Sequence, residues 1–259
     1  MCTVILLVRP GHDWPLLLAA NRDEMGNRPW DPPARHWSDR PETVAGRDRL
    51  AGGSWLGLND HGVVACVLNR RGTHGPDPTK RTRGELVLEA LDHADAVAAA
   101  QALGDLAPDS YRGFHLLVAD NRDAYWLKND AGRMTVAELP AGFTMLTALD
   151  ARNTPAHPRI ARHLPRFEAA PVPDPGAPNP AAPDPAAATW AAWTDILAAG
   201  PDATPEDALT IVPERPDGYG TVSSALIALP ARPSPRIRPV FRFAAGRPGV
   251  APYRPVVAV

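Results

Sequence analysis

A cysteine at position 2 and four consecutive polar residues at positions 21–24 are the residues of this chain best suited to chemistry. If Met1 is removed, Cys2 carries both a thiol and a free α-amine. Such an amine titrates near pH ~8, so its neutral form can accept the thiol proton. Nucleophile and base then belong to one residue, which suits attack on a carbonyl carbon. The alternative is that Cys2 is a small apolar residue at the start of a buried strand.

The polar residues Asn21, Arg22, Asp23 and Glu24, called here the polar quartet, directly follow an apolar run. This run, Leu16–Ala20, and the run Thr3–Val8 predict a β-hairpin that brings the quartet beside Cys2. The Arg22 cation would then favour the thiolate, and the Asp23 carboxylate would orient the amine. The alternative is that the quartet caps a turn and forms ion pairs, which contribute little when exposed.

The remaining apolar runs predict further hairpins and a few helices, typical of an α+β protein with antiparallel sheets. Asp60-His61-Gly62 predicts a turn between two strands, and Asp120-Asn121-Arg122-Asp123 predicts another. The sequence predicts helices over Gly84–Leu103, Pro158–Phe167 and Trp190–Ala199. Further strands are predicted over Val63–Asn69, Phe114–Ala119, Ala124–Leu127, Met134–Leu139, Phe143–Leu149, Thr221–Leu229 and Val240–Ala244.

Length and composition are those of a globular protein in a reducing compartment. The chain has 259 residues, a formal net charge of -2 and two cysteines, which exclude a disulfide framework. We expect a single domain over residues 1–259 with a Pro/Ala-rich loop at about 169–188. The first apolar run is too short for a signal peptide and nothing approaches a transmembrane span, so we expect a cytoplasmic protein.

Asn21-Arg22-Asp23-Glu24, spelt NRDE, behind an N-terminal Met-Cys resembles the signature of the NRDE family, also called the transport and Golgi organisation protein 2 family. The resemblance covers most of the chain outside the Pro/Ala-rich loop. The motifs that carry it are Arg28-Pro29, Ala45-Gly46-Arg47-Asp48, Gly52-Gly53-Ser54-Trp55-Leu56-Gly57, Leu68-Asn69, Arg83-Gly84-Glu85-Leu86-Val87, Phe114–Asp120 and Gly220-Thr221-Val222-Ser223-Ser224.

This resemblance implies a four-layer αββα sandwich of antiparallel sheets, the N-terminal-nucleophile hydrolase fold. A more distant similarity to penicillin V acylases and conjugated bile acid hydrolases implies Cys2 as nucleophile, Arg22 and Asp23 as the charged pair, and Asn69 as an oxyanion donor. One such donor is worth about 3 kcal/mol of barrier. Two positions depart from the relatives: Thr147-Ala148 stands where they often carry Ser-Asn, and Val222 where they often carry Arg.

Other candidate residues concern binding. Asn21 and Glu24 are candidates because they flank the charged pair, while Trp55 could stack a ligand or pack beside its glycines. The basic loop over residues 70–83 has two interpretations, a solvated loop or a phosphate site. Its candidate ligand contacts are Arg70, Arg71 and Arg83. No aromatic residues interleave with these cations, so we expect no nucleic acid partner. The histidines lack metal-ligand spacing, so we expect no metal site.

Two functions therefore stay open at this stage. The first is a cysteine hydrolase that acts on an amide or thioester bond of a small molecule and requires no cofactor. The second is a carrier on the same scaffold, because the resemblance implies links to haem trafficking and to acyl-CoA or lipid homeostasis. A carrier would bind haem through the Cys2 thiolate or a histidine, or acyl-CoA through the basic loop.

Overall fold

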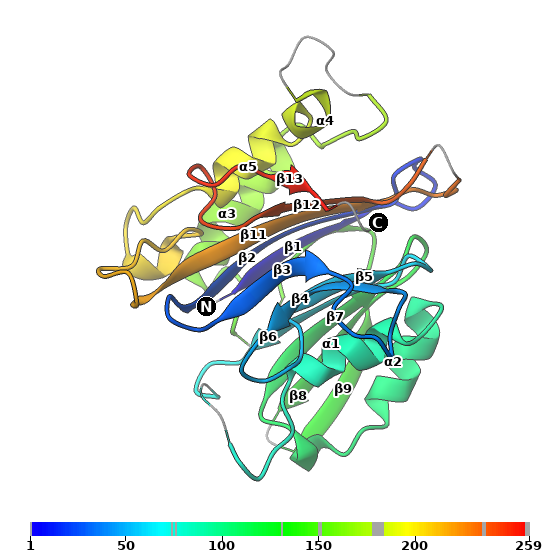
Figure 1. Ribbon diagram of the computed structural model, residues 1–259. Helices are drawn as coiled ribbons and strands as arrows, with labels where there is room; N and C mark the ends of the chain where they lie inside the picture. Colours follow the sequence, from blue (N-terminus) through cyan, green and yellow to red (C-terminus); the bar gives the residue numbers. More distant parts are fainter. Residues whose placement is uncertain are drawn as a thin grey trace. The chain divides into compact units, whose positions relative to one another are not determined.

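The computed structural model describes residues 2–73, 75, 77–130, 132–149, 152–177, 184–234 and 237–256. The chain forms two compact units, one of residues 1–28 and 142–255 and the other of residues 29–141 and 256–259. Each unit contains one antiparallel sheet with helices packed on it (Figure 1). The predicted single domain is therefore built from two units, of which the first is discontinuous in sequence.

The first unit contains a six-stranded sheet with the order β10-β1-β2-β11-β12-β13. The two apolar runs at the start of the chain form its central hairpin, as the sequence predicts. The strands are β1 (Thr3–Val8), β2 (Leu16–Met25), β10 (Gly142–Leu146), β11 (Tyr219–Leu229), β12 (Val240–Ala244) and β13 (Arg254–Pro255).

Strand β2 is longer than its apolar run, because the whole polar quartet belongs to it. Thr3 pairs with Asn21 on the β1 side, so Cys2 lies where β1 meets the quartet. On the other side, β11 pairs Thr221 with Asp23 but Ser223 with Arg22. A β-bulge at Val222 thus changes the register beside the quartet.

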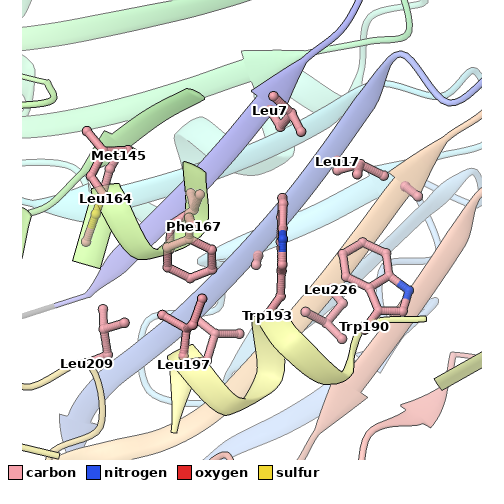
Figure 2. Packing of buried hydrophobic residues seen from close by; sticks show 14 of the residues in the cluster. Leu7, Leu17, Met145, Leu164, Phe167, Trp190, Trp193, Leu197, Leu209 and Leu226 are labelled. Atoms are coloured by element: carbon pink, nitrogen blue, oxygen red, sulfur yellow. The ribbon is translucent and has the colours of Figure 1, made fainter. Parts of the chain in front are cut away.

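Helices α3 (Pro158–Ala169) and α5 (Ala191–Leu197) cover one face of this sheet. Alternate residues of the strands, such as Ile5, Leu7, Leu17 and Ala19, join the helices in an apolar cluster. Figure 2 shows Trp193 in this cluster with Phe167 and Leu197 beside it. Aromatic ring contacts of 5.4 Å and 5.8 Å join Trp193 to Phe167 and Trp190. Burial of these large side chains fixes the helices on the sheet.

The second unit contains a seven-stranded sheet whose strands follow one another in chain order. Every connection joins neighbouring strands, so hairpins predicted from the apolar runs account for most of it. The strands are β3 (Trp30–Ala34), β4 (Thr43–Asp48), β5 (Leu56–Asn59), β6 (Val64–Asn69), β7 (Phe114–Ala119), β8 (Ala124–Asp130) and β9 (Arg133–Glu138).

The single helix predicted over Gly84–Leu103 is wrong, because two helices are present, α1 (Gly84–Leu91) and α2 (Ala96–Gly104). The Asp95 carboxylate accepts a hydrogen bond from the Ala98 backbone N–H and so begins α2. The amide of Asn59 donates to the carbonyl oxygens of Leu91 and His93 and fixes the end of α1. Both helices pack on the sheet through apolar residues.

Regular structure also occurs in two Pro-containing segments, and the second of them lies in the predicted Pro/Ala-rich loop. Strand β3 contains Pro32 and Pro33 and lies at the edge of its sheet, where proline is tolerated. The short helix α4 (Pro185–Ala188) lies within the predicted Pro/Ala-rich loop, and the Asp184 side chain caps it. Residues 178–183 of that loop lie outside the described residues. Within the described portion, no helix is long and apolar enough to cross a membrane.

Candidate functional site

Cys2 lies directly before β1 and its side chain is half-buried. Its thiol donates a long hydrogen bond to the backbone carbonyl oxygen of Asp23, with 3.7 Å between Sγ and O. The structure thus brings Cys2 and the polar quartet together, as the predicted hairpin requires. Cys66, by contrast, is buried in β6 and pairs with Leu56 and Leu117, as expected of a core residue.

Burial raises the pKa of the Cys2 thiol above its ordinary value. The Asp23 carboxylate raises this pKa further, whereas the Arg22 guanidinium lowers it without reversing the net shift. The direction expected of the Arg22 effect is therefore correct, but burial outweighs it and the thiol is favoured over the thiolate. A neutral thiol needs a base to become a nucleophile.

The Asp23 carboxylate is buried and lies among polar partners on the side of the sheet that carries α3. Its Oδ1 accepts a hydrogen bond of 2.6 Å from Thr221 Oγ1. Its Oδ2 lies 3.5 Å from a guanidinium nitrogen of Arg159, in the first turn of α3. The same nitrogen donates to Thr3 Oγ1 at 2.7 Å, so Arg159 contacts both strands of the central hairpin.

Arg22 and Glu24 alternate with Asp23 along β2, so their side chains lie on the opposite face of the strand. Arg22 pairs with Glu24 at 3.7 Å, and Glu24 lies at the same distance from Arg28. The Arg22 side chain is buried, while those of Glu24 and Arg28 are half-buried. Arg22 thus supplies a buried cation close to Cys2, and the role predicted for Glu24 in binding stays a prediction.

Asn21 makes hydrogen bonds that stabilise the fold. Its side-chain amide donates to the backbone carbonyl oxygens of Leu197 and Leu209, at 3.0 and 2.9 Å. Its carbonyl oxygen accepts from Ser224 Oγ, which in turn accepts from the Tyr253 hydroxyl. These bonds tie β2 to the end of α5 and to β11, and a ligand contact of Asn21 stays a prediction.

Asn69 and Trp55 belong to the second unit. Asn69 ends β6, where it pairs with Phe114 and is half-buried; its role as an oxyanion donor stays a prediction. Trp55 packs edge to face on Trp30, with 5.8 Å between ring centroids. A Cβ atom on Gly46 would lie 2.4 Å from the Trp55 ring, so the glycine permits this close packing.

Two of the three candidate arginines of the basic loop make hydrogen bonds or ion pairs with other residues of the protein. The Arg70 guanidinium donates to the Asn129 carbonyl oxygen at 2.9 Å and pairs with Asp130 at 2.7 Å. Arg83 donates to the backbone carbonyl oxygens of Thr73 and Gly113. Arg71 is exposed. These contacts favour a structural role for Arg70 and Arg83 over phosphate binding.

Sequence reasoning missed Arg159, Thr3 and Thr221 as partners of the site. Thr221 lies in a motif of the family, and Thr3 follows Cys2. The type of residue alone does not indicate which partner a threonine hydroxyl binds. Arg159 lies in an amphipathic helix, where an arginine usually faces solvent. These residues come together only because β1 and β11 pair with β2 and because α3 packs on this sheet. In the described part of the chain, no group of three His, Cys, Asp or Glu side chains could hold a metal ion.

Comparison with known proteins now places this geometry in a family. The Transport and Golgi organisation 2 family matches residues 1–169 of the 259, which include both strands of the central hairpin and Arg159. The chain belongs to this family. The Transport and Golgi organisation 2 homologue of Mus musculus is 36% identical over 112 residues, or 40% of this chain and 38% of that protein. The Homo sapiens homologue is 35% identical over 109 residues, with the same shares.

Solved structures similar to this family member share the N-terminal-nucleophile hydrolase fold. The N-acylethanolamine-hydrolyzing acid amidase orthologue of Caenorhabditis elegans matches with a TM-score of 0.59 and 14% identity, over 90% of this chain and 94% of that one. Penicillin V acylase from Agrobacterium tumefaciens gives 0.52 and 15%, over 94% and 83%. The C2A variant of conjugated bile acid hydrolase from Clostridium perfringens gives 0.53 and 10%, over 99% and 92%. At these identities the likeness establishes the fold alone.

Proposed function

We propose that this protein is a cysteine hydrolase that cleaves an amide or thioester bond of a small molecule, with Cys2 as nucleophile. The observation that carries the proposal is the half-buried Cys2 thiol beside the buried Asp23 and Arg22 at the start of the central hairpin. The fold of amide-cleaving enzymes supports it. So does the conjugated bile acid hydrolase from Clostridium perfringens, whose C2A variant has alanine in place of a cysteine at position 2.

Burial raises the pKa of the Cys2 thiol, so the thiol is protonated and must lose its proton before it attacks. Removal of Met1 would free the α-amine of Cys2, which accepts this proton within the same residue. The sulfur then attacks the carbonyl carbon and forms a tetrahedral oxyanion. Collapse of the oxyanion breaks the C–N or C–S bond, and the leaving group takes the proton from the amine. Water hydrolyses the acyl-cysteine to release the acid.

Intact-mass spectrometry of the purified protein after incubation with a panel of acyl amides and thioesters tests the proposal. We expect a chain without Met1 and an added acyl group that is located on Cys2. The C2A variant should lose both the adduct and turnover, whereas the C66A variant should keep them. Full retention of Met1 in active protein, or unchanged turnover in C2A, would contradict the proposal.

A non-catalytic carrier for haem or acyl-CoA is the second candidate, because a neutral, half-buried thiol is a poor nucleophile. Its residues fit these ligands poorly. Haem would be held by the Cys2 thiolate or by a histidine, and burial favours the thiol over the thiolate at Cys2. Acyl-CoA would need the loop cations Arg70 and Arg83, which contact Asp130 and the Gly113 carbonyl oxygen. When bound, haem would supply an iron centre that absorbs visible light. A haemin titration of wild type and C2A would reveal a saturable spectral change that requires Cys2.

A further inference from the structure

Arg159 contacts both strands that carry the candidate site. One guanidinium nitrogen donates to Thr3 Oγ1 at 2.7 Å and lies 3.5 Å from Asp23 Oδ2. Thr3 directly follows Cys2 in the chain. The backbone carbonyl oxygen of Asp23 accepts a hydrogen bond from the Cys2 thiol. A single side chain of α3 therefore joins the neighbour of the nucleophile to the residue that the nucleophile contacts.

This arrangement is unusual for a helix packed on a sheet, because it places an ion pair in the interior. The Arg159 and Asp23 side chains are 1% and 0% exposed. Burial of two ions costs free energy that their attraction only partly returns, so a buried pair is weak evidence for stability. A role in holding the site in place accounts for the pair better than a role in stability.

We propose that Arg159 is a positioning residue that fixes Cys2 relative to Asp23 by bridging Thr3 and the Asp23 carboxylate. The proposal rests on the function proposed for Cys2. Arg159 itself would contact no substrate: it would act by holding the two strand ends together and by balancing the charge of Asp23 close to the thiol.

The charged groups around this bridge are few within the described residues. Strand β2 supplies Asp23 and Arg22, and Arg22 pairs with Glu24. Strand β11 supplies hydroxyls, among them Thr221 on Asp23. Farther along α3, Arg162 pairs with Asp207, and Arg166 donates to His163. Within this group, Arg159 is the cation of α3 that faces Asp23.

The test measures the rate of Cys2 alkylation by iodoacetamide as a function of pH, with every variant made in a C66A background so that one thiol reacts. Arg159→Met leaves the Asp23 charge unbalanced beside the thiol. We expect alkylation to slow at least about threefold at a fixed pH below the midpoint, equivalent to about half a pKa unit. Arg159→Lys keeps the charge and should recover part of the rate.

Thr3→Val tests the bridge with a substitution of nearly constant shape. We expect a shift in the same direction as that of Arg159→Met but smaller. Thr144→Val is the matched control, because Thr144 is another buried threonine of this sheet and pairs with Leu6 in β1. The Thr144→Val variant should be alkylated at the same rate as its C66A parent.

Superimposed alkylation curves for Thr3→Val and its parent, or an equal shift in Thr144→Val, would overturn the proposal. If Arg159→Met does not fold, as judged by circular dichroism, the Thr3→Val curve decides alone. Alkylation needs no turnover, so this result is independent of the proposed hydrolase activity. Absence of an acyl adduct in the wild type would count against that activity, whereas an unshifted curve would count against the bridge.

Discussion

The two units bury their helices on their sheets in different ways. In the second unit, α1 and α2 meet the sheet through an apolar cluster that includes Ala45, Leu86 and Leu116. The first unit has a similar apolar cluster, but buried polar groups of Asn21, Asp23 and Arg159 lie between its helices and its sheet near Cys2. Buried polar side chains of the second unit, such as Asn59, bond to the ends of helices. The buried pair of Asp23 and Arg159 differs from these because it is an ion pair beside the candidate site.

The difference also determines how each unit responds to a substitution. An apolar interface loses free energy in proportion to the volume removed. A buried ion pair behaves differently, since removal of one partner leaves an uncompensated charge, whereas removal of both does not. The following predictions use this difference.

Asp23→Ala should have the largest effect, because it leaves the buried Arg159 cation without its carboxylate. We expect a loss of about 3–5 kcal/mol in the free energy of unfolding, measured by urea denaturation. The control is Asp60→Ala, which removes an exposed pair with Arg35 in the second unit, where the side chains are 45% and 36% exposed. That variant should lose only about 0–1 kcal/mol. Equal losses would contradict the interpretation of Asp23 as part of a buried pair.

The double variant Asp23→Ala with Arg159→Met should be more stable than Asp23→Ala alone. Both charges are then absent, and the remaining loss should be about 1–2 kcal/mol from cavity and hydrogen bonds. Contacting residues are expected to be non-additive in this way. A double-mutant cycle in urea measures the coupling, and additive losses would show that the two side chains do not act as a pair.

The first unit should also lose stability in acid. Burial lowers the pKa of His163 in α3 to about 4, while its Nε2 contacts the Asp207 carbonyl oxygen and Arg166 donates to its Nδ1. The unfolded state binds this proton at about pH 6.5, so between about pH 6.5 and 4 it binds more protons than the folded state. The free energy of unfolding should therefore fall as the pH falls through this window.

Urea denaturation at a series of pH values checks this dependence, with His163→Gln as the variant that removes the titrating group. The variant should show a flatter profile between about pH 6.5 and 4. Asp207 acts at lower pH: its burial opposes ionisation, but hydrogen bonds from three backbone N–H groups and Arg162 lower its pKa to about 2. An unchanged slope in His163→Gln would assign the acid effect to other groups.

The two cysteines should give the smallest effects on stability. Cys2 is half-buried at a chain end, so Cys2→Ala should change the free energy of unfolding by less than about 0.5 kcal/mol. Cys66 is buried in the sheet of the second unit, and Cys66→Ala should cost about 1 kcal/mol. Thermal melting of both variants compares them. A larger loss for Cys2→Ala would favour a core role for that residue.

Much of the fold was predictable because it depends on local pattern. Apolar runs such as Thr3–Val8 and Phe114–Ala119 became strands with the predicted bounds. The break at Asp95 was missed, although an aspartate at that position can cap a helix. Helix α4 was missed too, although Asp184 followed by Pro185 is a typical helix start. In both cases the prediction followed the overall composition of the segment, although a capping aspartate indicated the start of a helix.

The candidate site was predictable only in part. Cys2 and Asp23 lie in one hairpin, so their proximity follows from the pairing of adjacent strands. Arg159 lies far from both in sequence, and no local pattern distinguishes a buried arginine from a solvated one. The sequence indicates the sign of the Arg22 effect on the Cys2 pKa but not the net direction, since desolvation depends on the whole surrounding fold.

The bulge at Val222 has a consequence for evolution. Because of it, Thr221 pairs with Asp23 and Ser224 pairs with Asn21, and both hydroxyls bond to residues on the same face of β2 although they are three positions apart. Loss of that one residue would shift the register of β11 by one position. The side chains on one side of the bulge would then point to the opposite face of the sheet. Insertions and deletions should therefore be far rarer here than in the turns that join the strands.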